Sequence, residues 1–486
     1  MLATTNTSVL LMSSSHQMTK PNLRRAESGQ KLIESMKNKA HTKQIVFGTF
    51  IVLTMLLSGC CGGVQTPQDT KYLADFHLEN FEQSDKLLES QHLALYVDYS
   101  TCTMLGQNSP FFQALEPTFT QLATKYYSIK GSTIKEENLQ DSTAYLRLRN
   151  IKEVNYAELR QAANQIAAGN SESVLLTDGE YYTKNMAKGH DNDPWLADAF
   201  KAWILKGHDI HILSEPYVEG NRFNKKRFYI LFTDDRNPNN VYKRILRTVD
   251  LTQFPEVDEF HISASHPQLR GNGDNCSSQN ELLLSRSKGY GTFEIEDWNG
   301  CDWKTIENLL VNACDEQTGI PLDNGSPIIQ MGFDKNSFGC YSVESLNLRV
   351  YDINQEYASY YEEKANGQEP FRINDPLTEL ENFMEIDTDK FKEHSIIHIH
   401  FKKDWFDPNV LTGEPFNYFK LDLSIGEIAS IFGQHEEKFE FESISQQGTK
   451  NVSVASSIKQ CLADDEVIKK MKGQVIYSIY IKSEQK

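Results

Sequence analysis

Positive charge is scarce in this chain of 486 residues, which has 49 Lys and Arg against 67 Asp and Glu and a net charge of −18 at pH 7. Such a surplus of negative charge opposes binding to nucleic acid and to anionic lipid head groups. We therefore expect no nucleic-acid partner. Any attachment to a membrane must depend on a lipid or an apolar anchor rather than on a basic surface.

The familiar short motifs of catalysis and zinc binding are also absent. None of the 8 cysteines stands in a C-x-x-C spacing, which argues against a structural zinc site. The chain contains no G-x-S-x-G, no H-E-x-x-H and no glycine-rich phosphate loop. The commonest hydrolase and nucleotide-binding chemistries thus lack support, and we expect the protein not to be an enzyme.

Long apolar runs are missing apart from residues 45–57 (IVFGTFIVLTMLL), which are too short for a comfortable membrane span. The run follows basic residues and is closed by small ones, the pattern of a secretory signal peptide. We expect translation to begin at Met36, because Lys37, Lys39 and Lys43 then form a basic region of ordinary length.

The residues that close this run, Leu57-Ser58-Gly59-Cys60, resemble the lipobox of bacterial lipoproteins. The resemblance implies cleavage before Cys60 and lipidation of Cys60, so that lipid holds the protein in the bacterial cell envelope. A transmembrane anchor is the alternative. The residue after Cys60 is Cys61 rather than an aspartate, which resembles the pattern of lipoproteins sorted to the outer rather than the inner membrane. The domains would then lie in the periplasm or at the cell surface.

The predicted signal peptide covers residues 1–59. In the sequence that follows it, the pattern of apolar residues changes near residue 90 and again near residue 250. Residues 60–90 are polar and predict a lipidated tether. Residues 91–250 alternate short apolar runs with helical periodicity, whereas residues 251–370 and 371–486 show apolar alternation of period two. We predict an α/β domain over residues 91–250, followed by two β-rich segments. The mature chain has 42 basic and 65 acidic residues.

The α/β region has a regular order of elements. The pattern predicts strands at 93–98, 126–131, 173–179, 209–215 and 226–235, and helices at 109–126, 155–170, 193–208 and 237–249. Ser109 is a candidate cap before Pro110, and Gly169 a candidate helix end. Strands separated by helices imply a doubly wound, mostly parallel sheet of the Rossmann-like type.

The C-terminal region predicts mostly antiparallel sheet. Strands are expected at 291–298, 342–353, 395–403, 419–425, 438–444 and 474–483, and short helices at 303–314 and 464–473. The four cysteines between residues 276 and 340 are the best candidates for disulfides outside the cytoplasm.

Two predicted strands of the α/β region end in oxygen-bearing side chains, at Asp98-Tyr99-Ser100-Thr101-Cys102 and at Thr177-Asp178-Gly179. Ligands of open α/β sheets bind at the carboxyl ends of strands. The two segments resemble the D-x-S-x-S and T-D-G motifs of von Willebrand factor A-type domains, and the order of elements agrees over roughly residues 90–250. The resemblance implies a divalent-cation site that contains Asp98, Ser100 and Asp178.

A loop threonine completes the site in that family, which implies Thr143, with Ser142 as its neighbour and rival. Mg²⁺ or Ca²⁺ suits such oxygen ligands, and an open coordination position would accept a carboxylate from a partner. Cys102 stands where the motif has its last serine, and a thiol is a poor ligand for these cations. Either fewer groups hold the metal, or the site is degenerate and both aspartates only cap loops and helix starts.

Two histidine-containing segments are weaker candidates. His398 and His400 share one face of a predicted strand, as metal-binding histidines sometimes do, but a polar sheet face is the alternative because no third ligand is near in sequence. The segment from His190 to Asp193 could flank the cation, or could serve as turn and helix cap.

Three functions remain open from the sequence. The first is a non-catalytic envelope lipoprotein whose A-type-like domain binds a protein or glycan partner, with or without the cation. The second is a metal-dependent phosphatase-like hydrolase with Asp98 as nucleophile and Asp234 or Asp235 as metal ligands, although Ser100 stands where such enzymes place a second aspartate. The third is a structural envelope subunit with a degenerate metal site.

Overall fold

The computed structural model describes residues 88–100, 109–138, 156–182, 190–219, 223–265, 283–287, 293–295, 305–311, 326–358, 377–407, 410, 416–443 and 448–485. All of them belong to one compact unit that spans residues 67–486. Within these ranges, no helix combines the length and the apolar character needed to cross a membrane.

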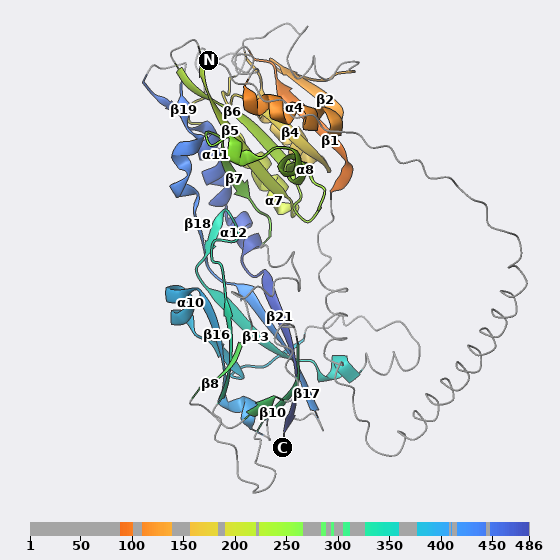
Figure 1. The fold of residues 1–486 in the computed structure, drawn as a ribbon, viewed down its shortest axis with the longest axis vertical. Helices are drawn as coiled ribbons and strands as arrows, with labels where there is room; N and C mark the ends of the chain where they lie inside the picture. Colours follow the sequence, from red (N-terminus) through yellow and green to blue (C-terminus); the bar gives the residue numbers. More distant parts are fainter. Residues whose placement is uncertain are drawn as a thin grey trace, which may run out of the picture. The chain divides into compact units, whose positions relative to one another are not determined.

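The N-terminal part of the described chain is an α/β domain built on one sheet of seven strands (Figure 1). Its elements are β1 (Glu89–Asp98), α4 (Pro110–Leu122), β2 (Ala123–Lys130), β3 (Thr133–Glu136), α6 (Leu159–Ala168), β4 (Ser171–Thr177), α7 (Ala197–Leu205), β5 (Asp209–Glu219), β6 (Phe223–Thr233), α8 (Val241–Thr248), η1 (Leu251–Gln253) and β7 (Asp258–Ile262). Each helix and strand predicted between residues 93 and 249 is present, with shifted ends.

The sheet is mixed, so the prediction of a mostly parallel sheet is wrong. Its order is β3-β2-β1-β4-β6-β5-β7, and only the pairs β1–β2 and β1–β4 are parallel. Parallel neighbours need a crossover of a dozen or more residues, but only residues 220–222 separate β5 from β6. These two strands therefore form a hairpin, and β6 pairs antiparallel with β4.

Helices cover both faces of this sheet, as the sequence predicted. Helices α4 and α8 pack on the face formed by alternate residues of β1 such as Leu93, Leu95 and Val97. Helices α6 and α7 cover the other face, to which Ala94 and Tyr96 belong. The short central strands are thus buried on both sides, which explains their continuous apolar sequences.

Local signals set several helix ends. Ser109 caps α4 by accepting a hydrogen bond from Phe112 N at 3.0 Å, and the proline that follows suits the first turn. Gly169 ends α6, as predicted. Asn240 caps α8 by accepting from Lys243 N at 2.7 Å.

The C-terminal region is β-rich. Its described elements are β8 (Leu283–Ser287), β9 (Phe293–Ile295), β10 (Thr305–Val311), β11 (Ser326–Gly332), β12 (Tyr341–Val343), β13 (Leu346–Asp352), β14 (Thr378–Glu379), β15 (Met384–Ile386), α10 (Thr388–His394), β16 (Ile396–Phe401), η3 (Lys403–Phe406), β17 (Phe416–Ile425), β18 (Ile428–Ser430), η4 (Phe432–Gln434), η5 (Glu436–Phe439), β19 (Phe441–Glu442), β20 (Lys450–Asn451), α11 (Ser453–Leu462), α12 (Asp465–Met471) and β21 (Val475–Gln485).

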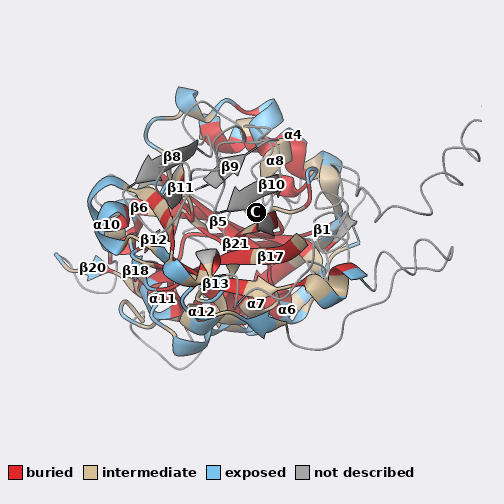
Figure 2. Cartoon of the chain, turned by 90° about the horizontal axis from the view of Figure 1, so that it is seen from below, coloured by how far each residue is buried: buried red, intermediate tan, exposed pale blue. Residues whose placement is uncertain are grey.

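The strands of this region form a sheet of six, a sheet of four and two small two-stranded sheets, mostly antiparallel. Strands from both predicted segments share the larger sheet, because β13 pairs with β17 and β10 pairs with β21. Its strands β17 and β21 are largely buried (Figure 2). The helix predicted at 303–314 is wrong, since β10 occupies that segment and β-sheet pairing overrides its helical periodicity.

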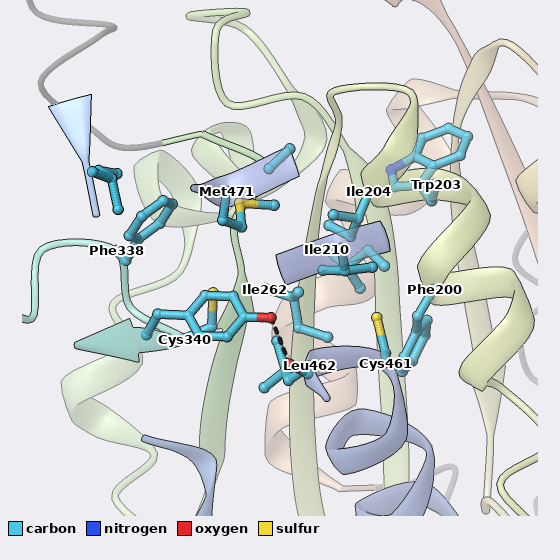
Figure 3. Packing of buried hydrophobic residues seen from close by; sticks show 14 of the residues in the cluster. Phe200, Trp203, Ile204, Ile210, Ile262, Phe338, Cys340, Cys461, Leu462 and Met471 are labelled. Atoms are coloured by element: carbon cyan, nitrogen blue, oxygen red, sulfur yellow. Dashed lines mark hydrogen bonds between the residues drawn. The ribbon is translucent and has the colours of Figure 1, made fainter. Parts of the chain in front are cut away.

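Helices α11 and α12 return to the α/β domain and pack against α7. Figure 3 shows Cys461 and Leu462 of α11 in one apolar cluster with Phe200, Trp203 and Ile204 of α7. Cys340, one of the four cysteines predicted as candidates for disulfides, is a buried thiol in the same cluster. The core is therefore continuous between the α/β domain and the C-terminal region.

Candidate functional site

The predicted site residues Asp98 and Asp178 lie at one edge of the seven-stranded sheet. Strands β1 and β4 are parallel neighbours, and the register pairs Val97 with Leu176. The residues that follow these strands therefore meet at the carboxyl edge, as the sequence predicted. Both aspartates are buried, with exposed fractions of 0% and 1%.

Asp98 is held by the two motifs that the sequence singled out. Its Oδ1 accepts a hydrogen bond from Ser100 N at 2.8 Å, and its Oδ2 accepts one from Thr177 Oγ1 at 2.9 Å. Thr177 Oγ1 in turn accepts from Gly179 N at 3.0 Å. These bonds tie the end of β1 to the turn after β4 and hold the two motifs together.

Asp178 is the least satisfied group at this edge. Its Oδ1 accepts from Glu180 N at 2.9 Å, while its buried Oδ2 has no hydrogen-bond partner among the described residues. Burial, and then the charges of Asp98 and Glu180, raise the pKa of the Asp178 carboxyl well above its usual value. A buried oxygen without a partner costs free energy unless a proton or a cation compensates it.

The C-terminal region covers the same edge. Lys225 Nζ contacts the carboxylate of Glu180 and donates to Glu442 O at 2.6 Å, and both side chains of the pair are buried. Ser453 Oγ, at the start of α11, donates to Gly179 O at 3.3 Å. The T-D-G turn is thus packed beneath elements more than 200 residues away in sequence, which no local sequence pattern could predict.

The other predicted site residues are only partly placed. Ser100 is buried beside Asp98, and its backbone nitrogen donates to that carboxylate. Thr143, Ser142 and Cys102 lie outside the described residues, as does Cys60. The role of Thr143 as a ligand and the effect of Cys102 therefore stay predictions.

The described groups suit a hard cation. The carboxylates of Asp98 and Asp178 are buried at this edge together with Ser100, and Lys225 Nζ contacts the neighbouring Glu180. Carboxylate and hydroxyl oxygens are the ligands that Mg²⁺ and Ca²⁺ prefer. Asp178 Oδ2 supplies a ligand atom to which no other described residue hydrogen-bonds. Asp98, Ser100 and Asp178 would hold such an ion.

Asp234 and Asp235 lie at the opposite edge of the sheet. Strand β6 runs antiparallel to β4, and its register pairs Phe228 with Thr177 but Phe232 with Ser173. The residues after β6 are therefore beside the beginning of β4, a strand length from Asp98. They cannot share a metal ion with Asp98, which removes the geometric basis of the phosphatase-like alternative.

Asp235 belongs instead to a cluster that sequence reasoning missed. His211 Nε2 lies 3.1 Å from Asp235 Oδ1, and its Nδ1 lies 3.3 Å from Glu259 Oε1. His261 stacks on His211 with ring centroids 4.0 Å apart, and its Nε2 lies 3.1 Å from Asp235 Oδ2. That contact is an ion pair rather than a hydrogen bond, because the geometry is not aligned.

This cluster holds strands together. The histidines come from paired positions of β5 and β7, since His211 is opposite His261, and Asp235 follows β6. Asp209 Oδ2 accepts from Asp235 N at 2.7 Å and so joins the same network. The signal that could have found it is the alternation of acid and histidine in Asp209-Ile210-His211, which places both side chains on one face of β5.

The loop from His190 to Asp193 contacts the C-terminal region. Asp191 Oδ2 accepts from Ser443 Oγ at 2.7 Å, and Asp191 O accepts from Val452 N at 2.7 Å. Asp193 pairs with Arg160. The hydrogen bond from Asp193 N to His190 O at 3.1 Å agrees with the predicted turn. The predicted helix cap is wrong, because α7 begins only at Ala197 and no side chain caps it.

No family model, no curated protein and no solved structure matches this chain.

Proposed function

We propose that residues 91–250 form a binding domain that resembles von Willebrand factor A-type domains, in a lipoprotein that Cys60 anchors in the bacterial envelope. Its partner would be a protein or a glycan, bound with the help of Mg²⁺ or Ca²⁺ at Asp98, Ser100 and Asp178, with Thr143 as the expected loop ligand. The observation that carries this proposal is the buried pair Asp98 and Asp178, with Asp178 Oδ2 unpartnered among the described residues.

The charge balance of the site supports a cation. Asp98, Asp178 and Glu180 would carry three negative charges when ionised, against the single positive charge of Lys225. A buried excess of like charges is costly, so Asp178 keeps its proton unless a cation replaces it. A divalent ion would allow all three carboxylates to ionise and would supply an electrophilic centre for a partner's carboxylate.

A non-catalytic function agrees with the remaining features. The acidic chain opposes nucleic acid, and Asp98 already accepts two hydrogen bonds that fix its carboxylate. We place the domains in the periplasm or at the cell surface, on the outer rather than the inner membrane, where divalent cations have access to them. The phosphatase-like alternative would need ligands other than Asp234 and Asp235.

A structural envelope subunit is the second candidate. Helix α11 and Glu442 cover the T-D-G turn, so that the described residues of the site are nearly inaccessible. A site without access to a partner favours a structural role. In that case Asp178 would stay protonated and no cation would bind. The two functions therefore differ in a property that can be measured.

The test compares thermal unfolding of the full chain in EDTA with unfolding in Mg²⁺, Ca²⁺ or Mn²⁺. A cation at 100 times its dissociation constant stabilises the folded state by about 2.7 kcal/mol. We expect the wild type to gain this stability and Asp178→Asn to gain none. Glu172→Gln is the matched control, because Glu172 is also a buried carboxylate with a raised pKa, at the opposite end of β4.

Equal shifts in wild type and Asp178→Asn would place the ion elsewhere, and no shift in the wild type would favour the structural subunit. Binding of the wild type to arrayed bacterial glycans and to cross-linked envelope proteins should then be cation-dependent. Asp178→Asn should lose that binding while Glu172→Gln keeps it.

A further inference from the structure

Strand β16 carries two histidines on the outer face of the four-stranded sheet. Ile397, Ile399 and Phe401 of this strand are buried, whereas His398 and His400 alternate with them and are partly exposed. The prediction that the histidines share one face is therefore confirmed. The sequence offered no third ligand, and the fold supplies one.

The third group is Asp387, at the N-terminus of the short helix α10, which lies beside β16 (Figure 1). Asp387 N donates to His398 O at 2.8 Å, which fixes the start of α10 against the strand. One ring nitrogen of each histidine and one carboxylate oxygen of Asp387 lie within 4.8 Å of one another. Two imidazoles and one carboxylate therefore converge at one point.

The distances suit an ion between the groups better than direct contact. His400 Nε2 lies 4.0 Å from Asp387 Oδ2, which is too far for a hydrogen bond. Zinc binds nitrogen and carboxylate oxygen at about 2.0 to 2.2 Å, so one ion can touch both atoms after a small movement. Asp387 Oδ1 caps α10 by accepting from Asp389 N and Lys390 N, while Oδ2 has no hydrogen bond among the described residues.

The hydrogen bond of His398 also favours its role as a metal ligand. Its Nε2 lies 2.8 Å from Gln330 Oε1, and because that oxygen only accepts, Nε2 carries the proton and Nδ1 keeps its lone pair. A polar partner on the outer nitrogen is how metal-bound histidines are usually oriented.

We propose that Asp387, His398 and His400 bind a divalent transition metal ion, with zinc as the best fit, and that Gln330 orients His398. Imidazole nitrogen selects such ions over Mg²⁺ and Ca²⁺. Asp387 and His400 have exposed side-chain fractions of 31% and 32%, so an ion can enter from solvent and keep water in its remaining positions. The cluster of His211, Asp235 and His261 is a weaker candidate, because Asn240 Nδ2 already donates to Asp235 Oδ1 and both ring nitrogens of His211 already face carboxylates.

The test is a calorimetric titration of the full chain with ZnCl₂ and the absorption spectrum with Co²⁺. Asp387→Asn, His398→Gln and His400→Gln should each lose one bound zinc, or weaken its binding by more than about 100-fold, since even second-shell changes cost about 10-fold to 100-fold. The ligand-field bands of Co²⁺ should be lost with them. Asn at position 387 keeps the oxygen that caps α10.

His394→Gln is the matched control, because His394 is an exposed histidine at the end of α10 with a side-chain exposure of 54%, and it should bind zinc as the wild type does. Gln330→Ala should weaken zinc by about 10-fold to 100-fold. Unfolding temperatures in EDTA identify any variant that fails to fold. The proposal is overturned if all folded variants bind zinc as the wild type does, or if the wild type binds none.

Discussion

At the scale of single residues, Gly179 explains why the T-D-G turn has its sequence. Its φ of +77° lies in the left-handed region, which favours glycine. A Cβ there would lie 2.7 Å from Phe228 Cε2 and 3.1 Å from Val454 Cγ2. The residue is therefore required both by the backbone of the turn and by the approach of α11.

We predict that Gly179→Ala lowers the free energy of unfolding by roughly 2 to 4 kcal/mol, because a left-handed conformation and overpacking add their costs. Gly473→Ala is the control, since Gly473 has a φ of +78° but no atom within 4 Å of the added Cβ. It should cost only roughly 1 to 2 kcal/mol, because only the left-handed conformation is unfavourable there. Urea denaturation measures the free energy of unfolding of both variants. Equal losses of this free energy would show that packing at Gly179 contributes nothing.

At the scale of elements, the network of His211, Asp235 and His261 joins β5, β7 and the loop after β6. Burial alone would lower the pKa of His261, but the carboxylates of Asp209 and Asp235 outweigh burial and raise it to about 9. Contacts with His211 and His261 lower the pKa of Asp235 despite its burial. The stability of this end of the sheet should therefore depend on pH.

The pKa of His261 is raised in the folded state from an unfolded value of about 6.5. The stabilisation of the folded state by protonated His261 is therefore fully present below pH 6.5 and is lost as the pH rises through 9. We predict that His261→Gln costs roughly 1 to 3 kcal/mol at pH 6 and much less above pH 10. Denaturation curves across this range, with His394→Gln as control, measure the difference. A loss that does not change with pH would contradict the ionic role.

Helix α11 shows why one element escaped prediction. Its buried face includes Ser453 and Ser457, which hide the apolar periodicity of the segment. Ser457 Oγ donates to Ser453 O at 2.7 Å and accepts from Leu196 N at 3.1 Å, so the serine is satisfied by a partner more than 200 residues away. A local cap at Ser109 and the glycine at the end of α6 made α4 and α6 predictable, whereas α11 depends on contacts that only the folded chain provides.

At the scale of the whole molecule, the negative charge of the chain and its predicted lipid anchor are complementary. An acidic protein gains little from electrostatic attraction to anionic lipid, so the predicted attachment would depend on the acyl chains. A lipid at Cys60 would therefore leave the folded domains with no need to bind the membrane themselves.

We predict that Cys60→Ala abolishes incorporation of labelled palmitate and moves the protein from the membrane fraction to the soluble fraction, because Cys60 is the expected site of lipidation. Cys61→Ala is the matched control and should leave both properties unchanged. Fractionation of cells that express each variant measures the outcome. Membrane attachment of Cys60→Ala without label would instead support a transmembrane anchor.

The sequence alone determined most elements of the α/β domain but neither β3 nor β7, and it determined the meeting of Asp98 and Asp178 at one sheet edge and the shared face of His398 and His400. These features depend on local periodicity, caps and strand ends, which short segments encode. Only the tertiary structure decided the mixed order of the sheet, the cover of the T-D-G turn by α11, and the approach of Asp387 to the two histidines. Such features arise from pairing between distant segments, whose energies no local pattern records.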